Sequence, residues 1–309
     1  MKLHKLNINK TFRAKNLCLC IGNFDGIHIG HQHVIKKILK SSQEHKMKSA
    51  IMTFTPHPKI FFKKNNKNFN ITTNNFKKKF LSDLGIEHYI EYSFNKSLSN
   101  LDGIDFIKKI LVKQLHVKKI IVGKDFRFGK DRSGDTKLLK ILSSICDYKL
   151  QIIEHVKNKN NNLKFSSSSI RKNITNGAFE KVADALGRDW HMKGKIIKGN
   201  QKARLINFPT ANMTPGTHII PRKGVYCVKV IINDKEYKGI ANFGERPTVY
   251  GTNLLLETHI FEYNEDIYGK QLTVEFLTFI RPEKKYKDFK TLTSQIRKDV
   301  IKAKKYHKI

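Results

Sequence analysis

The pattern of apolar residues changes about two thirds of the way along this chain of 309 residues, and the change limits what the chain can fold into. Before residue 190, short apolar runs alternate with segments that carry apolar residues at helical spacing. Such alternation is typical of βαβ crossovers and of a mostly parallel sheet with helices on its faces. After about Gly194, strand-like segments follow one another with turns between them, which predicts an antiparallel barrel. We therefore expect two domains of different classes, residues 1–187 and 188–309.

The same patterns predict the individual elements. In the first domain we expect strands at 17–22, 49–54, 89–92, 119–123 and 150–154, and helices at 28–45, around 106–111, at 135–145, at 168–175 and at 178–186. In the second we expect strands at 225–232, 237–243, 254–261 and 272–279, then an amphipathic helix whose apolar face carries Phe289, Leu292, Ile296 and Val300. Ligands of a parallel sheet bind beyond the carboxyl ends of its strands, so residues that follow these strands are candidates for a site.

The charge is strongly basic, with 60 Lys plus Arg against 26 Asp plus Glu and a formal net charge of +34. Such a field attracts nucleic acids and also phosphorylated small molecules. Most of the basic residues are Lys and accompany abundant Asn and Ile, which is a compositional bias, and the run Lys77–Lys79 is expected on a solvated face. We therefore expect small-molecule substrates and no nucleic-acid partner.

Membrane and disulfide signals are weak. No apolar run approaches the roughly 18 to 20 residues of a spanning helix, and the first ten residues lack the apolar stretch of a secretory signal. Cys18, Cys20, Cys146 and Cys227 form no C-x-x-C pair, so they are expected to be buried thiols. We expect a cytoplasmic protein without a membrane partner, as a monomer or weak homo-oligomer.

A glycine-rich segment, GNFDGIHIGH at 22–31, lies where the first strand is expected to give way to the first helix. Glycines allow close approach of a ligand to the backbone, and the free amides of a helix start attract anions. His28 and His31 are three residues apart, so both imidazoles can face one phosphate group and donate hydrogen bonds to it. An isolated pair of this kind also fits ordinary core or surface histidines, or a metal site. The glycine-rich strand end favours the phosphate.

This segment resembles the H-x-G-H signature of the nucleotidyltransferase superfamily, in the form seen in prokaryotic bifunctional riboflavin kinase/FAD synthetases. The segments TFTPHP at 53–58, VGKDFRFG at 122–129 and FSSSSIR at 165–171 are similar to further motifs of that family, with Ser168 where the family has Thr. The resemblance implies catalytic roles for His28, His31 and Arg171. It implies flavin contacts for His57 and Pro58, and contacts with ATP or phosphate for Gly22, Asn23, Phe24, Asp25, Gly30, Asp125, Ser166 and Ser167. Core packing explains Phe54, Phe126 and Phe128 equally well.

A second group of motifs begins with GKIIKG at 194–199 and ARLINFPTAN at 203–212, which resembles the riboflavin kinase element of the same family. Ala203 and Asn207 stand where that family usually has glycine. The resemblance implies that Thr210 and Asn212 bind Mg²⁺ and ATP. It further implies a phosphate contact for Gly199, the catalytic base in Glu257 and a flavin contact for Arg281. Without the resemblance, the segment FPTAN at 208–212 also fits a proline turn capped by its Asn, and Glu257 also fits an outward-facing strand residue.

Together these motifs imply a Rossmann-like α/β nucleotidyltransferase domain followed by an antiparallel β-barrel riboflavin kinase domain with a C-terminal helix. The expected enzyme phosphorylates riboflavin to FMN with ATP and then adenylates FMN to FAD with release of pyrophosphate, with Mg²⁺ as cofactor. Two alternatives remain at this point: a riboflavin kinase with an inactive nucleotidyltransferase-like scaffold, and a nucleic-acid-binding protein.

Overall fold

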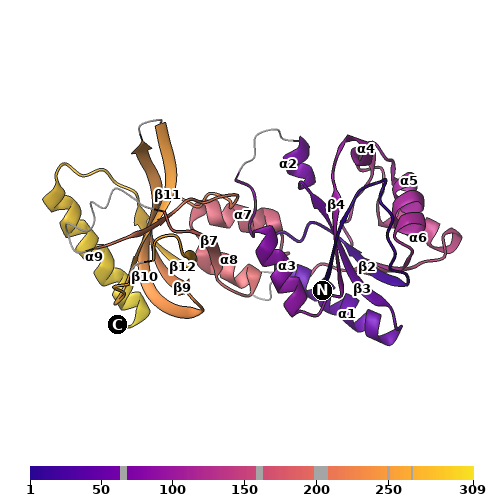
Figure 1. Ribbon diagram of the computed structural model, residues 1–309, viewed down its shortest axis with the longest axis horizontal. Coiled ribbons are helices and arrows are strands. Elements are labelled where there is room, and N and C mark those ends of the chain that lie inside the picture. The colour runs from indigo at the N-terminus through magenta and orange to yellow at the C-terminus, as the bar shows by residue number, and fades with distance from the viewer. Residues whose placement is uncertain (63–67, 158–162, 198–207, 249–250, 266) are drawn as a thin grey trace. The chain divides into compact units, whose positions relative to one another are not determined.

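The computed structural model describes residues 1–62, 68–157, 163–197, 208–248, 251–265 and 267–309 (Figure 1). The chain forms two compact units, one of Met1–Asn66 with Thr73–Ser166 and one of Lys67–Thr72 with Ser167–Ile309. Helices α7 (Ser167–Asn176) and α8 (Phe179–Leu186) therefore group with the barrel strands. The boundary predicted after residue 187 separates the parts expected to carry the two activities, not the two packed units. It stays a prediction.

The first unit contains a six-stranded sheet in which every neighbouring pair of strands is parallel. In sheet order the strands are β1 (Lys2–Leu6), β4 (His88–Ser93), β3 (Lys48–Thr55), β2 (Leu17–Ile21), β5 (Val117–Gly123) and β6 (Lys149–Ile153). The five strands expected from the sequence are confirmed. Strand β1 was not expected, because it lies at the sheet edge with three of its five residues exposed and therefore lacks an apolar run.

Helices cover both faces of this sheet (Figure 1). They are α1 (Ile29–Glu44), α2 (Pro58–Phe62), α3 (Asn74–Asp83), α4 (Lys96–Ser99), α5 (Gly103–Asp105), the π-helix η1 (Phe106–Gln114), the 3₁₀-helix η2 (Lys130–Arg132) and α6 (Thr136–Ile145). Side chains of β2 alternate between two cores. Leu19 packs in the cluster that contains Phe106, whereas Cys20 packs in the cluster that contains Ile35. This explains why β2 reads as a continuous apolar run.

The second unit contains a six-stranded antiparallel sheet. In sheet order the strands are β7 (Trp190–Lys195), β12 (Gln271–Pro282), β9 (Gly224–Ile232), β10 (Lys235–Thr248), β11 (Gly251–Ile260) and β8 (Ala211–Met213). The sheet curls onto itself, since the amide of Ile197, just after β7, donates to the carbonyl of Asn212 in β8 at 2.8 Å. The predicted barrel is confirmed.

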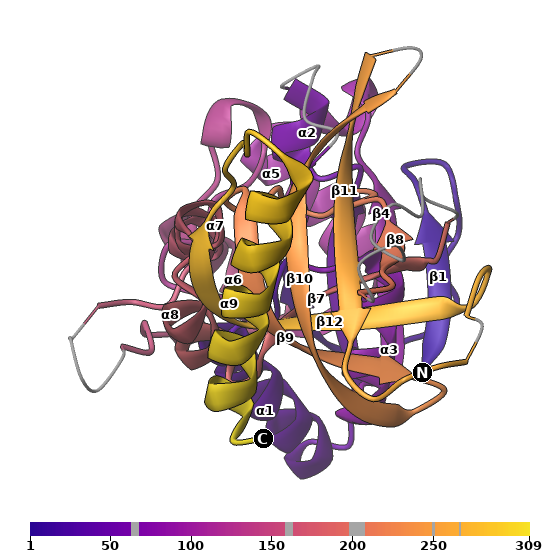
Figure 2. The same ribbon diagram turned by 90° about the vertical axis from the view of Figure 1, so that its left-hand side faces the viewer.

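Aromatic side chains fill the core of the second unit. Phe276 lies 5.0 Å from both Trp190 and Tyr226, measured between ring centroids, and all three are buried. Helix α9 (Phe289–His307) lies against the curled sheet (Figure 2), where Ala303 packs with Cys227. The expected C-terminal helix is thus confirmed. Among the described residues, no helix combines the length and the apolar character needed to cross a bilayer.

Candidate active sites

His28 and His31 meet at the start of α1. His28 is the N-cap residue, and its Nδ1 accepts a hydrogen bond from the backbone amide of His31 at 3.2 Å. The two imidazoles stack with centroids 3.6 Å apart. Gly30 leaves room for this arrangement, because a Cβ at that position would lie 3.1 Å from His28 Nδ1. The spacing in the sequence thus brings both rings to the positive end of the helix.

His31 is held neutral by its surroundings. Burial, followed by the nearby His28 and Lys77, lowers the pKa of His31 well below its usual value of 6.5. Its Nδ1 is buried and has no hydrogen-bond partner in the described part of the chain. A neutral imidazole donates from one ring nitrogen and accepts at the other, so His31 can bind an anion without titrating near neutral pH.

Lys77 is a candidate residue that the sequence analysis missed. Its side chain is only 8% exposed, and its Nζ donates to the carbonyl of Asn23 at 2.9 Å. The expectation that the whole run Lys77–Lys79 is solvated is therefore wrong for Lys77. The available signal was its position four residues before Leu81, which places both on the buried face of α3.

The other predicted residues of the first unit follow neighbouring strands. Gly22 follows β2, His57 follows β3 and Asp125 follows β5, so all three lie at the carboxyl edge of the sheet. Asp125 is exposed and pairs with Lys164 and His155, each at 2.9 Å, and these contacts lower its pKa.

Closer to the histidines, Phe24 and Asp25 are buried, and the ring of Phe24 lies 5.0 Å from that of His31. Pro58 begins α2. The predicted aromatic residues beyond these act in packing: Phe128 belongs to the core, and Phe54 and Phe126 pack against it.

The serine and arginine motif is divided between the units. Ser166 ends the first unit, whereas Ser167 and Arg171 belong to α7 of the second. There the Nε of Arg171 donates to the carbonyl of Phe69 at 3.0 Å, and its guanidinium lies 3.8 Å above the centre of the Phe69 ring. The roles predicted for these residues stay predictions.

In the barrel, strand register brings the predicted kinase residues into one row. Asn212 of β8 pairs with Glu257 of β11, Glu257 with Asn242 of β10, Asn242 with Val225 of β9, and Val225 with Arg281 of β12. Directly paired residues share a face of the sheet. A register shift between Phe279 and Arg281 adds one residue to β12 just before the row.

Two cavities lie beside this row. The first, of about 740 Å³, is lined by Asn212, Glu257 and Arg281, with an apolar wall from α9. The second, of about 720 Å³, is lined by Thr258 together with Tyr263, Tyr268 and Ile196. Thr210 lines both cavities. Gly199, for which a phosphate contact is predicted, lies outside the described residues. So do Ala203 and Asn207, which stand where the family usually has glycine.

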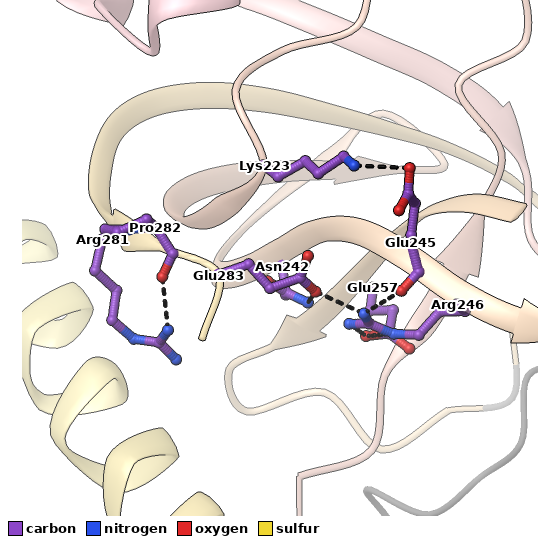
Figure 3. A network of polar contacts seen from close by, with 8 residues as sticks. All are labelled: Lys223, Asn242, Glu245, Arg246, Glu257, Arg281, Pro282 and Glu283. Atoms are coloured by element: carbon purple, nitrogen blue, oxygen red, sulfur yellow. Dashed lines mark hydrogen bonds and ion pairs between the residues drawn. The ribbon is translucent and has the colours of Figure 1, made fainter. Parts of the chain in front are cut away.

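Glu257 is ion-paired inside the first cavity (Figure 3). The Nε of Arg246 lies 3.0 Å from Glu257 Oε2, and its Nη2 contacts the same oxygen. The Nη1 of Arg246 lies 2.7 Å from Glu283 Oε1. Burial lowers the pKa of Arg246, but the two carboxylates raise it by more, so the guanidinium stays charged. Arg281 points away from this group and pairs with Asp299 of α9 at 2.7 Å.

The residues predicted to hold Mg²⁺ offer oxygen ligands. The Oδ1 of Asn212 is buried without a hydrogen-bond partner among the described residues, while its Nδ2 faces the carbonyl of Thr210 at 3.4 Å. An amide oxygen and a hydroxyl suit Mg²⁺, which keeps several waters and takes the remaining ligands from phosphates. In the same described ranges, no three His, Cys, Asp or Glu residues cluster as a metal site.

Comparisons with known proteins divide the chain in the same order. A family model described as FAD synthetase matches residues 11–169, and one described as riboflavin kinase matches residues 186–307. The bifunctional riboflavin kinase/FMN adenylyltransferase of Buchnera aphidicola subsp. Acyrthosiphon pisum is 36% identical over 297 residues, which cover 95% of this chain and 94% of the relative. The Bacillus subtilis protein of that name is 33% identical and covers 98% of this chain and 96% of its own. A solved structure described as a macrolide-efflux protein from Streptococcus pneumoniae has a TM-score of 0.86 at 28% identity and covers 96% of this chain and 97% of that one.

Proposed function

The chain belongs to the family of bifunctional riboflavin kinase/FMN adenylyltransferases, and we propose that residues 188–309 phosphorylate riboflavin while residues 1–187 adenylate the resulting FMN. The two family models together match nearly the whole chain, and the relatives that match it carry both names. The enzyme therefore has both activities and uses ATP. A single working half, with the other kept as a scaffold, has no support in these matches.

For the kinase half, the supporting observation is that Thr210 lies between two cavities and Glu257 lines one of them. The cavity with the apolar wall from α9 is suited to the flavin ring, and the other is suited to the nucleotide. Glu257 then accepts the proton of the terminal ribityl hydroxyl as the hydroxyl oxygen bonds to the γ-phosphorus. The bond from that phosphorus to ADP breaks, and its electron pair leaves with ADP. Thr210 and Asn212 would hold Mg²⁺, which supplies charge neutralisation on the phosphates when bound.

For the adenylyltransferase half, the stacked histidines at the start of α1 support the proposal. The FMN phosphate attacks the α-phosphorus of ATP, and pyrophosphate leaves. No protein nucleophile is needed, since His28, His31 and the amides of the helix start can donate hydrogen bonds to the oxygens that gain charge. Lys77, which lies close enough to lower the pKa of His31, adds positive charge at this point.

The proposal is tested by incubating the full chain with riboflavin, ATP and Mg²⁺ and separating the flavins by chromatography over time. We expect FMN first and FAD after it. His28→Ala is expected to lose FAD formation and keep FMN formation, whereas Glu257→Ala is expected to lose FMN formation and still convert added FMN to FAD. If both variants stay folded but each loses both activities, the assignment of one activity to each half of the chain is refuted.

A further inference from the structure

Arg246 occupies an unusual position for a residue with no assigned role. It lines the same cavity as Glu257 and lies between two carboxylates, those of Glu257 and Glu283. The side chains are 28% exposed for Arg246, 27% for Glu257 and 32% for Glu283, so the cluster is partly shielded but open to the cavity. The group carries two negative charges and one positive charge within hydrogen-bond distance.

The local backbone is shaped to hold Glu283 against Arg246. Gly244 lies on β10 two residues before Arg246, on the same face of the strand. A Cβ at position 244 would collide with the carboxylate of Glu283. The missing side chain therefore lets Glu283 lie over the strand and contact Arg246 independently of Glu257.

The contact between Arg246 and Glu257 competes for one of the two oxygens through which Glu257 could act as a base. A general base must present a carboxylate oxygen to the substrate hydroxyl at about 2.6–3.2 Å. Here two nitrogens of Arg246 contact Oε2 of Glu257, so the substrate hydroxyl can use that oxygen only after the guanidinium has moved away from it. The hydroxyl must also lie next to the γ-phosphorus, which brings the γ-phosphate oxygens within reach of the guanidinium. Arginine donates in a planar fork that fits phosphate as well as carboxylate.

We propose that Arg246 exchanges partners during the kinase reaction: it pairs with Glu257 before ATP binds and with the γ-phosphate afterwards, while Glu283 keeps it in place. This inference rests on the proposed role of Glu257 as base. The exchange frees Oε2 of Glu257 to accept the hydroxyl proton when a phosphoryl group is present to be transferred. In the same step the guanidinium offsets charge on the phosphoryl oxygens.

The test uses the full chain and measures kcat and KM for FMN formation in Arg246→Ala, Arg246→Lys and Lys223→Gln. Lys223 pairs with Glu245 at 2.7 Å beside this network and does not line the cavity, so it controls for loss of a nearby positive charge (Figure 3). We expect Arg246→Ala to lower kcat roughly 10²- to 10³-fold, and Arg246→Lys to recover part of the loss. The KM for riboflavin is expected to stay within about threefold, and Lys223→Gln to resemble the parent enzyme.

Chemical rescue separates a chemical role from a structural one. Added guanidinium ion at millimolar concentration is expected to restore FMN formation in Arg246→Ala, whereas sodium chloride at equal ionic strength is not. Fluorescence of Trp190, which is buried in the barrel core and is the only tryptophan of the chain, reports whether the barrel is folded. If Arg246→Ala unfolds the barrel, the double variant with Glu283→Gln removes the repulsion between the two carboxylates and is tested in its place.

The outcomes distinguish this inference from the proposed function. If Glu257→Gln abolishes FMN formation while folded Arg246→Ala keeps a parental kcat, the exchange of partners is refuted and the base is retained. If folded Arg246→Ala loses activity but guanidinium fails to restore it, the inference is likewise refuted. If Glu257→Gln keeps full kinase activity, the proposed role of Glu257 as base is refuted, and so is the inference that rests on it.

Discussion

Replacing Gly30 by alanine tests how closely the adenylyltransferase site depends on His28. A Cβ at position 30 would lie 3.1 Å from Nδ1 and 3.2 Å from Cε1 of His28. The ring cannot withdraw freely, because it stacks on His31 at 3.6 Å between centroids. His28 must therefore shift by a few tenths of an ångström.

The expected change in stability is small, because two effects oppose each other. Alanine in place of glycine favours the helix by roughly 0.5–1 kcal/mol. A strained or broken N-cap bond from the amide of His31 to His28 costs roughly 0.5–2 kcal/mol. The net change in the free energy of unfolding is therefore within about 1 kcal/mol.

The rate of FAD formation is expected to fall. Since a misplacement of about 1 Å can cost 10²-fold in rate and His28 shifts by a few tenths of an ångström, we expect Gly30→Ala to slow conversion of FMN to FAD by about three- to tenfold. Conversion of riboflavin to FMN by the same preparation is the internal control and is expected to be unchanged. Both rates come from chromatographic separation of the flavins, and the free energy of unfolding comes from urea titration.

A double-mutant cycle with His28→Ala makes the reasoning refutable. If Gly30→Ala acts through His28, the double variant loses no more FAD formation than His28→Ala alone. Full additivity of the two losses, or an equal loss of FMN formation in Gly30→Ala, would show that the contact with His28 is not the cause.

Two further predictions concern stability. His4 and His88 share a hydrogen bond of 2.9 Å between ring nitrogens, and burial, aided by nearby positive charge, lowers both pKa values. The folded pair therefore takes up protons at lower pH than the unfolded histidines, whose pKa is near 6.5, so urea titrations are expected to show a lower free energy of unfolding at pH 5.5 than at pH 7.5. If His4→Gln loses as much free energy of unfolding between pH 7.5 and pH 5.5 as the parent protein, protonation of this histidine pair is not the cause. Asp299→Asn is expected to destabilise the barrel by about 3–5 kcal/mol, because it leaves the guanidinium of Arg281, only 19% exposed, without its charged partner. Trp190 fluorescence during urea titration measures this, and a change below about 1 kcal/mol would count against a buried ion pair.

The fold was largely predictable because its signals are local. Five strands of the parallel sheet coincide with apolar runs in the sequence, and α1 begins at Ile29, within the glycine-rich segment. Strand β1 escaped prediction because an edge strand with exposed side chains needs no apolar run. Its pairing with β4 depends on residues more than 80 positions away.

The two candidate sites differ in what their sequences could reveal. His28 and His31 are three residues apart on one helix, so helical geometry alone brings their rings together. Lys77 of α3 reaches the carbonyl of Asn23 across 54 positions of the chain, and although its spacing from Leu81 indicates the buried face of α3, no local pattern specifies this contact.

The chain's own pattern of apolar residues, glycines and histidines determined the two fold classes, the order of the domains and the meeting of His28 and His31 at the start of α1, because helical and strand periodicities act over a few residues. Only the tertiary structure decided which residues share the barrel cavity. The row from Asn212 through Glu257 to Arg281 depends on the register of five strands and on an extra residue in β12. A slip of one residue would turn every side chain of a strand to the other face, and no local pattern around Arg246 or Glu257 specifies that they meet.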